Sequence, residues 1–299
     1  MSRPTRHIQT DYAFGVEKVA HTLDGEKTGW HAVRRTDRSG KEALLGMAKD
    51  NYEIVLNDTL VQTAREAFTN LKADNYEEKL FCTLGGSRFY GEYTFKDKTI
   101  EVPKVGDTIG LRLTLNNSYD RSCKVGFSMG FVRLVCTNGM VTNSRDYDFN
   151  QLHSGKVAIA EAQDAIERAF DGFNADSMAI FGEMAHKEVT QKQGEIIVDN
   201  MAIKSLVSAA ARDSIKMIWA APTHQNADAN RNLFNLYNAF TQHLTHSPTA
   251  GYEKFENSRK TSRKIFDRFE KITRNEDEQK QWMVRFPEKK KAVEVVVEA

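Results

Sequence analysis

Two runs of alternating apolar and polar residues, separated by a short polar turn, constrain the fold of this chain more than any other feature. The runs are 109–116 and 124–131. Side chains of a β-strand point alternately to its two faces, so the alternation predicts two strands and the turn predicts a β-hairpin. One face of this hairpin is apolar. It carries Ile109, Leu111, Leu113, Leu115, Val125, Phe127, Met129 and Phe131.

The opposite face of the hairpin is basic, small and polar. Five basic residues and one acid, Asp120, lie between Thr108 and Arg145, and Gly126 and Gly130 leave this face without bulk. A glycine inside a strand is typical of a bulge, a bend or a close approach by another backbone. We therefore expect this face to be a track for single-stranded nucleic acid. The residues expected to contact the strand are Arg112, Asn116, Asn117, Tyr119, Arg121, Lys124 and Arg133.

Two other interpretations of this polar face stay open. It is also typical of the solvated side of a sheet whose other side covers helices. A groove of small residues under a helix would show the same pattern.

A second basic segment, residues 258–274, has a helical pattern. It contains seven basic residues and two acids, and its apolar residues Ile265, Phe266, Phe269 and Ile272 share one side of a helix. Basic side chains neutralise phosphates and release counterions, so affinity for nucleic acid falls steeply with salt. The side chains expected to form this second track are Arg259, Lys260, Arg263 and Lys264. A solvated surface helix would show the same pattern.

The composition limits the class of protein. The net charge is +1, so attraction to nucleic acid has to come from local clusters of cations. Three cysteines at unrelated spacings predict no disulfide framework and favour a reducing compartment. The N-terminus lacks the apolar core of a signal peptide, and no run approaches the roughly 18 apolar residues of a membrane span. We expect a soluble, cytoplasmic protein that does not contact membranes.

Candidate catalytic and metal-binding residues are few. His243 and His246 are three residues apart near the end of a predicted helix, without the nearby cysteines or paired carboxylates of a zinc site. No glycine-rich phosphate loop and no GxSxG sequence occurs. The sequence therefore predicts no catalytic residue, no metal and no cofactor, and we expect a protein that is not an enzyme. A metal-dependent enzyme that uses the two histidines is the alternative.

The order of the patterns predicts an α+β fold. Strand-like segments and one helix, 57–71, come first, and helical stripes follow, one of them from Asp199 to Ile218. This order favours a mostly antiparallel sheet with an N-terminal helix, followed by a C-terminal helical region packing on it. The expected parts are an irregular arm at 1–27, a sheet-and-helix core at 28–150, a helical region at 151–246, and a loop, basic helix and tail at 247–299.

Several blocks resemble the uncharacterised phage/plasmid-like protein family, carried mainly by bacteriophages, prophages and plasmids. LTLNNSYDRSCKVGFSMGFVRLVCTNGM, from Leu113, and RNLFNLYNAFTQHLTH, from Arg231, are similar to two of its motifs. TGWHAV and LGMAKDNYEIVLNDTLVQTAREAF are similar to its early segments. The resemblance spans most of residues 28–246 and implies a mobile-element origin and a bacterial cytoplasm. It supplies no catalytic residues, and it associates the chain with accessory proteins of DNA metabolism.

These observations favour a single-stranded-DNA-binding, strand-annealing protein of phage recombination or replication that works as a homo-oligomer. The alternative is a phage-encoded interaction protein that inhibits or redirects a host factor. In that case the small-residue groove receives a protein segment. A host or phage protein of replication or recombination is a further expected partner. Oligonucleotide binding that weakens with salt distinguishes the first hypothesis from the second.

Overall fold

The chain divides into two compact units. The structure is a computed structural model. The first unit comprises Met1–Glu101 and Thr108–Met178, and the second comprises Val102–Asp107 and Ala179–Ala299. In the part of the chain that the structure describes, no helix is long and apolar enough to cross a membrane. The described residues are 11–36, 42–102, 105–133, 138–140, 148–154, 157, 159–171, 176–222, 230–246 and 253–287.

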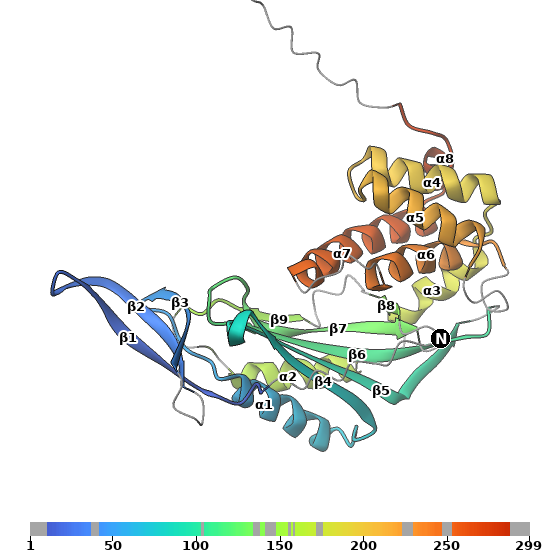
Figure 1. The fold of residues 1–299 in the computed structure, drawn as a ribbon. Helices are drawn as coiled ribbons and strands as arrows, with labels where there is room; N and C mark the ends of the chain where they lie inside the picture. Colours follow the sequence, from blue (N-terminus) through green and yellow to red (C-terminus); the bar gives the residue numbers. More distant parts are fainter. Residues whose placement is uncertain are drawn as a thin grey trace, which may run out of the picture. The chain divides into compact units, whose positions relative to one another are not determined.

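The first unit begins with a three-stranded antiparallel sheet, in the order β1–β2–β3 (Figure 1). Its strands are β1 (Gly15–Leu23), β2 (Glu26–Thr36) and β3 (Glu42–Lys49). Asp24 and Gly25 join β1 to β2, with φ angles of 50° and 86°. Positive φ at both residues is typical of a type I′ turn, which Asp-Gly favours and whose twist matches the flanking strands. The predicted irregular arm at 1–27 is therefore wrong for Gly15–Leu23, and the Asp-Gly pair was the signal for the hairpin.

A six-stranded sheet forms the centre of the first unit. Its strands are β4 (Tyr76–Thr83), β5 (Arg88–Val102), β6 (Asp107–Ser118), β7 (Val125–Arg133), β8 (Asn138–Met140) and β9 (Asp148–Gln151). The order is β4–β5–β6–β7–β8, and β9 also pairs with β7. A short 3-10 helix at Leu84–Gly86 joins β4 to β5. The predicted hairpin, β6–β7, thus lies inside the sheet, with neighbouring strands on both of its sides.

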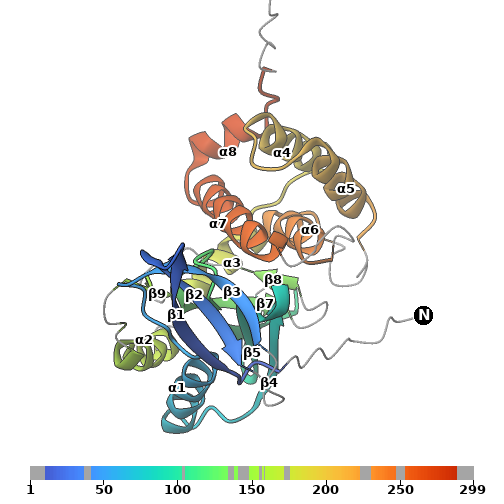
Figure 2. The same cartoon turned by 60° about the vertical axis from the view of Figure 1, so that its left-hand side comes forward.

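Helices α1 (Asn57–Asn70) and α2 (Ile159–Asp171) lie side by side on one face of this sheet (Figures 1 and 2). Phe68 of α1 packs edge-on against Phe95 of β5, with ring centroids 5.0 Å apart. Phe170 of α2 packs against the same ring at 4.8 Å. These rings are buried, and so are the residues predicted for the apolar face of β6–β7. Burial of apolar surface is the dominant favourable contribution to folding, so this face is the core of the unit.

The second unit consists mainly of helices. They are α3 (Asp176–His186), α4 (Gln191–Ile203), α5 (Ala209–Ala220), α6 (Leu233–His246), α7 (Glu253–Arg274) and α8 (Glu276–Trp282). Every residue of α6 from Leu233 to Thr241 is buried. Tyr237 and Phe240 of α6 pack against Phe269 of α7, with ring centroids 5.3 and 5.4 Å apart. Aromatic contacts between α6 and α7 therefore form a large part of this core.

One asparagine attaches the segment after α8 to α4. The Nδ2 of Asn200 donates to the carbonyl oxygens of Trp282, at 2.9 Å, and Val284, at 2.8 Å. Its Oδ1 accepts from the N–H of Phe286 at 2.8 Å. Asn200 is fully buried, so a single amide side chain satisfies three backbone groups and fixes this segment.

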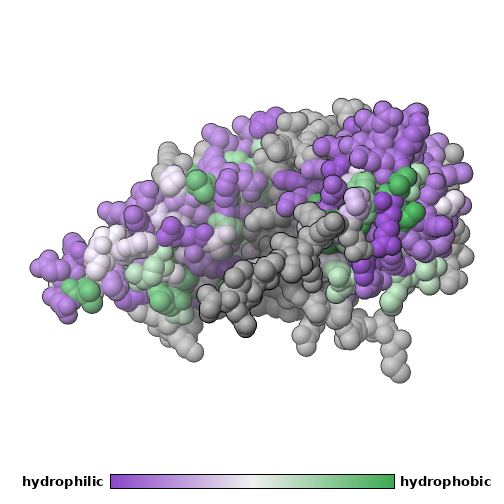
Figure 3. All heavy atoms as spheres, turned by 90° about the horizontal axis from the view of Figure 1, so that it is seen from above, coloured by the Kyte–Doolittle hydropathy of each residue, from purple (hydrophilic) through white to green (hydrophobic). Residues whose placement is uncertain are grey.

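Exposed hydrophobic residues are scattered over both units. Large examples are Leu23, Leu44, Met217 and Val284. On the face drawn in Figure 3, hydrophilic residues predominate among the coloured residues. Single exposed hydrophobic residues are normal on a protein surface and by themselves indicate no binding site.

The predicted architecture is confirmed in its mixed α and β content and its antiparallel sheets. The prediction of an N-terminal helix is wrong, because α1 follows the three strands of a separate sheet. Helix α2 belongs to the first unit, although a boundary was predicted at residue 150. The physical reason is that Phe170 completes the aromatic core around Phe68 and Phe95.

Candidate nucleic-acid interface

The β6–β7 hairpin has the register that the alternating pattern predicts. Leu113 pairs with Met129, and Arg112 pairs with Gly130. Directly opposed residues of two antiparallel strands point to the same face, so apolar residues share one face and polar residues share the other. The hairpin and the composition of its two faces are confirmed.

The polar face of this hairpin is buried, so the prediction that it is open to a polyanion is wrong. Arg112 has 15% of its side chain exposed, and its guanidinium lies 3.9 Å from a carboxylate oxygen of Glu92 on β5. Asn116 is 3% exposed and donates to the carbonyl oxygen of Lys124. Arg133 pairs with Ile109, so it lies on the apolar face and not on the polar one, and it is fully buried. Burial keeps these three side chains away from solvent, which leaves them unsuited to bind phosphates.

Gly126 allows another backbone to approach closely, as a glycine inside a strand suggests. The backbone that approaches is strand β9 of this chain. A Cβ at Gly126 would lie 1.9 Å from the carbonyl oxygen of Phe149 in β9. Strand β9 pairs with β7 from Val125 to Ser128. The glycine therefore makes room for β9 and not for a nucleic acid.

The turn between β6 and β7 is a structural junction. The Nδ2 of Asn117 donates to the carbonyl oxygen of Val55 and to Oδ1 of Asn57, both at 2.8 Å. The hydroxyl oxygen of Tyr119 accepts from the N–H of Asn57 at 3.1 Å. Tyr119 is fully buried, and burial raises the pKa of its phenol above the ordinary value. Neither Asn117 nor Tyr119 is available to nucleic acid, which corrects the predicted role of both.

The three-stranded sheet packs on the same turn. A Cβ on Gly46 of β3 would lie 2.6 Å from the carbonyl oxygen of Tyr119, so the two backbones are in contact. The hydroxyl of Tyr52 donates to the carbonyl oxygen of Ser118 at 2.5 Å. The blocks LGMAKDNY and NNSYDRS therefore meet at this junction. The buried cluster that joins them consists of Phe14, Val33, Leu45, Ala48, Tyr52 and Tyr119.

Arg121 and Lys124 of the turn are exposed, as predicted. Arg121 has a left-handed backbone, with φ at 64°. The N–H of Ser122 donates to Oδ1 of Asp120 at 2.9 Å, which closes a tight Asx turn. The other carboxylate oxygen of Asp120 lies 2.8 Å from Nε of Arg88. Because this acid is paired with Arg88, Arg121 and Lys124 give the tip of the turn a positive charge.

An aromatic ring lies beside Arg121. The Nζ of Lys49 and the guanidinium carbon of Arg121 each lie 5.7 Å from the ring centroid of Trp30. Trp30 of β2 and Lys49 of β3 are cross-strand partners. Trp30 is half-buried and Lys49 is exposed. Cations within about 6 Å of an indole ring are attracted by its quadrupole. We name the surface formed by Trp30, Lys49 and Arg121, together with the exposed Lys124 of the same turn as Arg121, the tryptophan patch.

Two members of the tryptophan patch, Trp30 and Lys49, were not predicted from the sequence. The available signal was the alternation of β2, in which Trp30 and the buried Val33 occupy opposite faces of the strand. A tryptophan on the face opposite the core is a candidate contact residue. No local pattern shows that β2 lies next to the turn that carries Arg121.

The predicted second track lies only partly within the described residues. The side chains of Arg259 and Lys260 are not among those that the structure describes. On α7, Lys264 is exposed and Arg263 is half-buried. Further along the helix, Arg268 lies 2.9 Å from Oε2 of Glu278, and its guanidinium lies over the ring of Trp282. The amphipathic helix is confirmed, and part of its positive charge is used within the second unit.

The titratable groups of the described residues with a shifted pKa include two histidines and one cysteine. Within the described ranges, no three His, Cys, Asp or Glu side chains come together as a metal site requires. Burial lowers the pKa of His153 and of His243. Burial also raises the pKa of the Cys82 thiol to about 12, so this cysteine is a poor nucleophile. The tryptophan patch combines positive charge with an aromatic surface, which is suited to an anionic polymer that carries planar groups.

Comparison with known proteins gives a family and no further relative. Residues 44–285 match the family described as a domain of unknown function, DUF932. No curated protein and no solved structure matches the chain. The matched range covers more than half of the chain and includes the β6–β7 hairpin and α6. The chain therefore belongs to the DUF932 family, which is defined by a domain of unknown function.

Proposed function

We propose that the protein binds single-stranded DNA and anneals strands in phage recombination or replication, without enzymatic activity. The observation that carries this proposal is the tryptophan patch, where Lys49 and Arg121 each lie 5.7 Å from the ring centroid of Trp30. In this proposal the chain originates from a phage, prophage or plasmid, acts in the cytoplasm of the bacterial host, and works as a homo-oligomer.

The chemistry of the patch favours a single strand over a duplex. Stacking of a base on an aromatic side chain contributes about 1–3 kcal/mol and tolerates any base. A duplex keeps the faces of its bases stacked on one another, so only a single strand offers a base to Trp30. Lys49, Arg121 and Lys124 supply charge for the phosphates next to such a base. Since the chain has a net charge of only +1, the attraction is local and weakens with salt.

The alternative function is an interaction protein that inhibits or redirects a host factor, and the position of β1 at the edge of its sheet favours it. Strand β1 is at the edge of the three-stranded sheet, and most of its residues are exposed. Leu23, next to the hairpin turn, is 65% exposed. An edge strand presents N–H and C=O groups to which a partner can add a strand. In this alternative the partner is a host or phage protein of replication or recombination.

Fluorescence anisotropy with labelled single-stranded and double-stranded oligonucleotides tests the proposed function. We expect the wild-type protein to prefer the single strand. Trp30→Ala removes the stacking surface and should weaken single-strand binding by about 1–3 kcal/mol, roughly a 5-fold to 150-fold loss of affinity. The matched control is Leu44→Ala, which removes an exposed apolar side chain from the same sheet and should leave the affinity unchanged.

Equal affinity of Trp30→Ala and wild type for the single strand would contradict the proposed role of the patch. Absence of any oligonucleotide binding, together with salt-insensitive binding to a bacterial replication protein, would favour the alternative function.

A further inference from the structure

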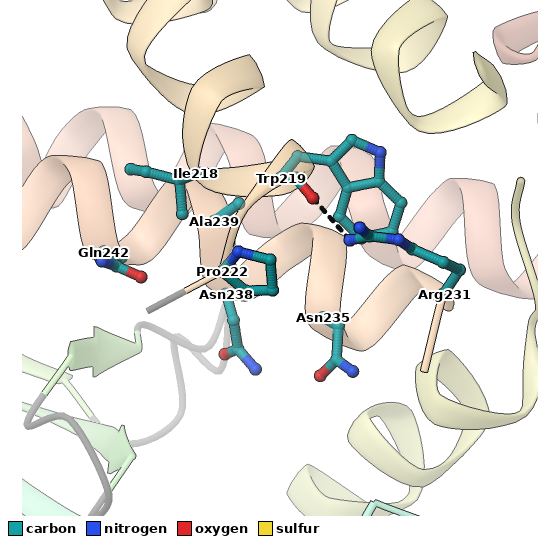
Figure 4. Close-up of a pocket in the computed structure, with 8 residues that line it drawn as sticks. All are labelled: Ile218, Trp219, Pro222, Arg231, Asn235, Asn238, Ala239 and Gln242. Carbon is teal, nitrogen blue, oxygen red and sulfur yellow. Dashed lines mark hydrogen bonds between the residues drawn. The ribbon is translucent and has the colours of Figure 1, made fainter. Parts of the chain in front are cut away.

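The cavity between the end of α5 and the middle of α6 is too small for a ligand larger than water (Figure 4). Its volume is about 10 Å³, which holds one water molecule. The guanidinium of Arg231 lies over the ring of Trp219, and the amides of Asn235 and Asn238 point away from this pair. A surface that can hold a partner lies instead in the first unit, along the edge of β1.

Strand β1 lies at one rim of the three-stranded sheet (Figure 1). Every strand has two edges, and one edge of β1 pairs with β2 from Gly15 to Leu23. Among the described residues, no strand pairs with the other edge. The N–H and C=O groups along that edge are therefore a template for a further strand.

The outer edge of β1 is open to pairing. Proteins commonly block an edge with a short strand, a proline, a bulge or a charged side chain. Strand β1 has nine residues and no proline, and the irregularity at Ala20/Thr22 places its extra residues in β2. The charge of Lys18 is held by its own chain, because its Nζ donates to the carbonyl oxygens of Asp50 and Tyr52, each at 2.8 Å.

The sequence of β1 is complementary to itself when two copies run antiparallel. A two-fold axis at Val19 sets this residue opposite its own copy, and it sets Glu17 opposite His21 of the second copy. Glu17 and His21 are both exposed. The Nδ1 of His21 contacts Oγ1 of Thr28 at 3.0 Å, which leaves Nε2 for a carboxylate. Directly opposed pairs of opposite charge stabilise a sheet.

The charges of β1 also distinguish this register from its neighbours. An axis at Lys18 opposes two lysines, and an axis at Glu17 opposes two carboxylates. Like charges directly opposite each other destabilise a sheet. An axis at Ala20 sets Glu17 opposite the apolar Leu23. The axis at Val19 is therefore the favoured one.

We propose that two copies of the protein associate through antiparallel pairing of their β1 strands, with Val19 on the two-fold axis. The pairing joins two three-stranded sheets into one. Val19 is opposite Ala32 in the register of β1 and β2, and Ala32 is two residues from Trp30, so all three share a face. A two-fold axis perpendicular to the sheet keeps that face on one side, which places both tryptophans on the same side. The inference rests on the proposed function, whose homo-oligomer it specifies.

Cysteine cross-linking of the full chain tests the pairing and its register. In Val19→Cys the two new thiols face each other, with a Cα separation of about 4.5–5.5 Å that a disulfide accepts. Oxidation should give a covalent dimer on a non-reducing denaturing gel. In Glu17→Cys the two thiols are four residues out of register, about 14 Å apart, so this variant should run as a monomer. The wild type, with its own three cysteines, should also run as a monomer.

Sedimentation velocity at rising protein concentration measures the association without a cross-link. Val19→Lys sets two ammonium groups directly opposite each other, so the dissociation constant of the dimer should rise roughly fivefold or more. The matched control is Leu44→Lys, which adds the same charge to an exposed position of β3 in the same sheet. This control should associate as the wild type does.

A charge exchange tests the register while leaving Val19 in place, so it is independent of how the Val19 variants fold. Glu17→Lys removes the acid opposite His21 and should weaken the dimer. Adding His21→Glu to this variant restores opposed charges of opposite sign and should recover the association.

The inference is overturned if the wild type sediments as a monomer at every concentration, or if Val19→Cys and Glu17→Cys cross-link to the same extent. It is also overturned if the charge exchange fails to recover association, or if the β1 edge binds only a bacterial replication protein. The proposed function fails separately, because cross-linking needs no DNA. Covalent dimers that bind no oligonucleotide would remove only the DNA-binding role, whereas oligonucleotide binding without covalent dimers would remove only this interface.

Discussion

The hydroxyl of Tyr119 is a structural hydrogen-bond acceptor for the start of α1. It accepts from the N–H of Asn57 at 3.1 Å, and the first N–H groups of a helix have no partner inside the helix. Tyr119→Phe leaves this buried N–H unsatisfied. We expect urea denaturation to show a loss of about 1–3 kcal/mol in the free energy of unfolding. Oligonucleotide affinity of the folded variant should be unchanged. A variant as stable as the wild type would contradict this role.

His153 makes the stability of the first unit depend on pH. Its ring stacks on Tyr52, with centroids 4.8 Å apart. Burial lowers the pKa of His153 below 6.5, although the nearby Glu53 opposes the shift. Because the unfolded chain binds this proton more tightly than the folded chain, the free energy of unfolding falls as the pH drops below about 6.5. The fall continues until the lowered pKa of the folded state is passed.

The variant His153→Phe keeps an aromatic ring beside Tyr52 and removes the titration. In urea denaturation from about pH 7.5 to about pH 5, we expect the wild type to lose more stability than this variant. His243, whose pKa burial also lowers, contributes equally to both proteins, so the difference isolates His153. Equal losses in the two proteins would count against a buried, neutral His153.

At the residue scale, the sequence predicts which residue types share a face, but it does not predict which of them are exposed. Arg121 and Lys124 were expected at a binding surface and are exposed, whereas Asn117 and Arg133 of the same hairpin are buried. The difference comes from packing partners that are distant in the sequence. Trp30 is a site residue that the sequence did not predict. Its contact with Arg121 follows only from the way the three-stranded sheet packs on the turn.

At the element scale, Gly126 is expected to control the pairing of β9 with β7. A Cβ at this position would lie 1.9 Å from the carbonyl oxygen of Phe149, so Gly126→Ala forces β9 to move. We expect thermal or urea denaturation to show a loss of about 1–3 kcal/mol, as for other overpacked sites. Gly15→Ala is the control, since its Cβ meets only the carbonyl oxygen of Thr36 at 3.6 Å. Equal stability of the two variants would refute the close approach of β9.

The segment after α8 is expected to depend on Asn200. Asn200→Ala leaves two carbonyl groups and one N–H without their partner, at a cost of about 1–3 kcal/mol. We expect the segment to detach from α4, and trypsin to cleave faster after Arg285. Lys192→Ala changes an exposed residue of α4 and serves as the control. Cleavage at the same rate in both variants would show that other contacts hold the segment.

Strongly periodic elements were predictable, and irregular ones were not. The runs of β6 and β7 and the stripe of α7 gave the correct elements. The single helix expected from Asp199 to Ile218 is interrupted, because α4 ends at Ile203 and α5 begins at Ala209. Ser205 has a positive φ of 59°, and residues 204–208 contain neither glycine nor proline. Glycine and proline, the usual signals of a helix end, are therefore missing here, although Ser208 caps the start of α5.

For the whole molecule, the mixed α and β content was predictable because the hydrophobic period changes along the chain from two to about 3.6. The division into two units was not predictable from the sequence, because α2 joins the first unit through contacts such as that of Phe68 with Phe170. The DUF932 match at residues 44–285 covers parts of both units. It includes Lys49, Arg121 and Lys124 of the tryptophan patch.

Single-stranded DNA binds, in our proposal, through the exposed cations of the tryptophan patch. For single strands, the logarithm of the affinity falls with the logarithm of the salt concentration by about 0.7 per neutralised phosphate. The double variant Arg121→Gln with Lys124→Gln removes two cations, so its slope should be less steep by about 1.4. The control, Lys72→Gln with Lys79→Gln, changes two exposed lysines of the same unit and should keep the wild-type slope. A wild-type slope in the Arg121 and Lys124 double variant would contradict DNA binding at this patch.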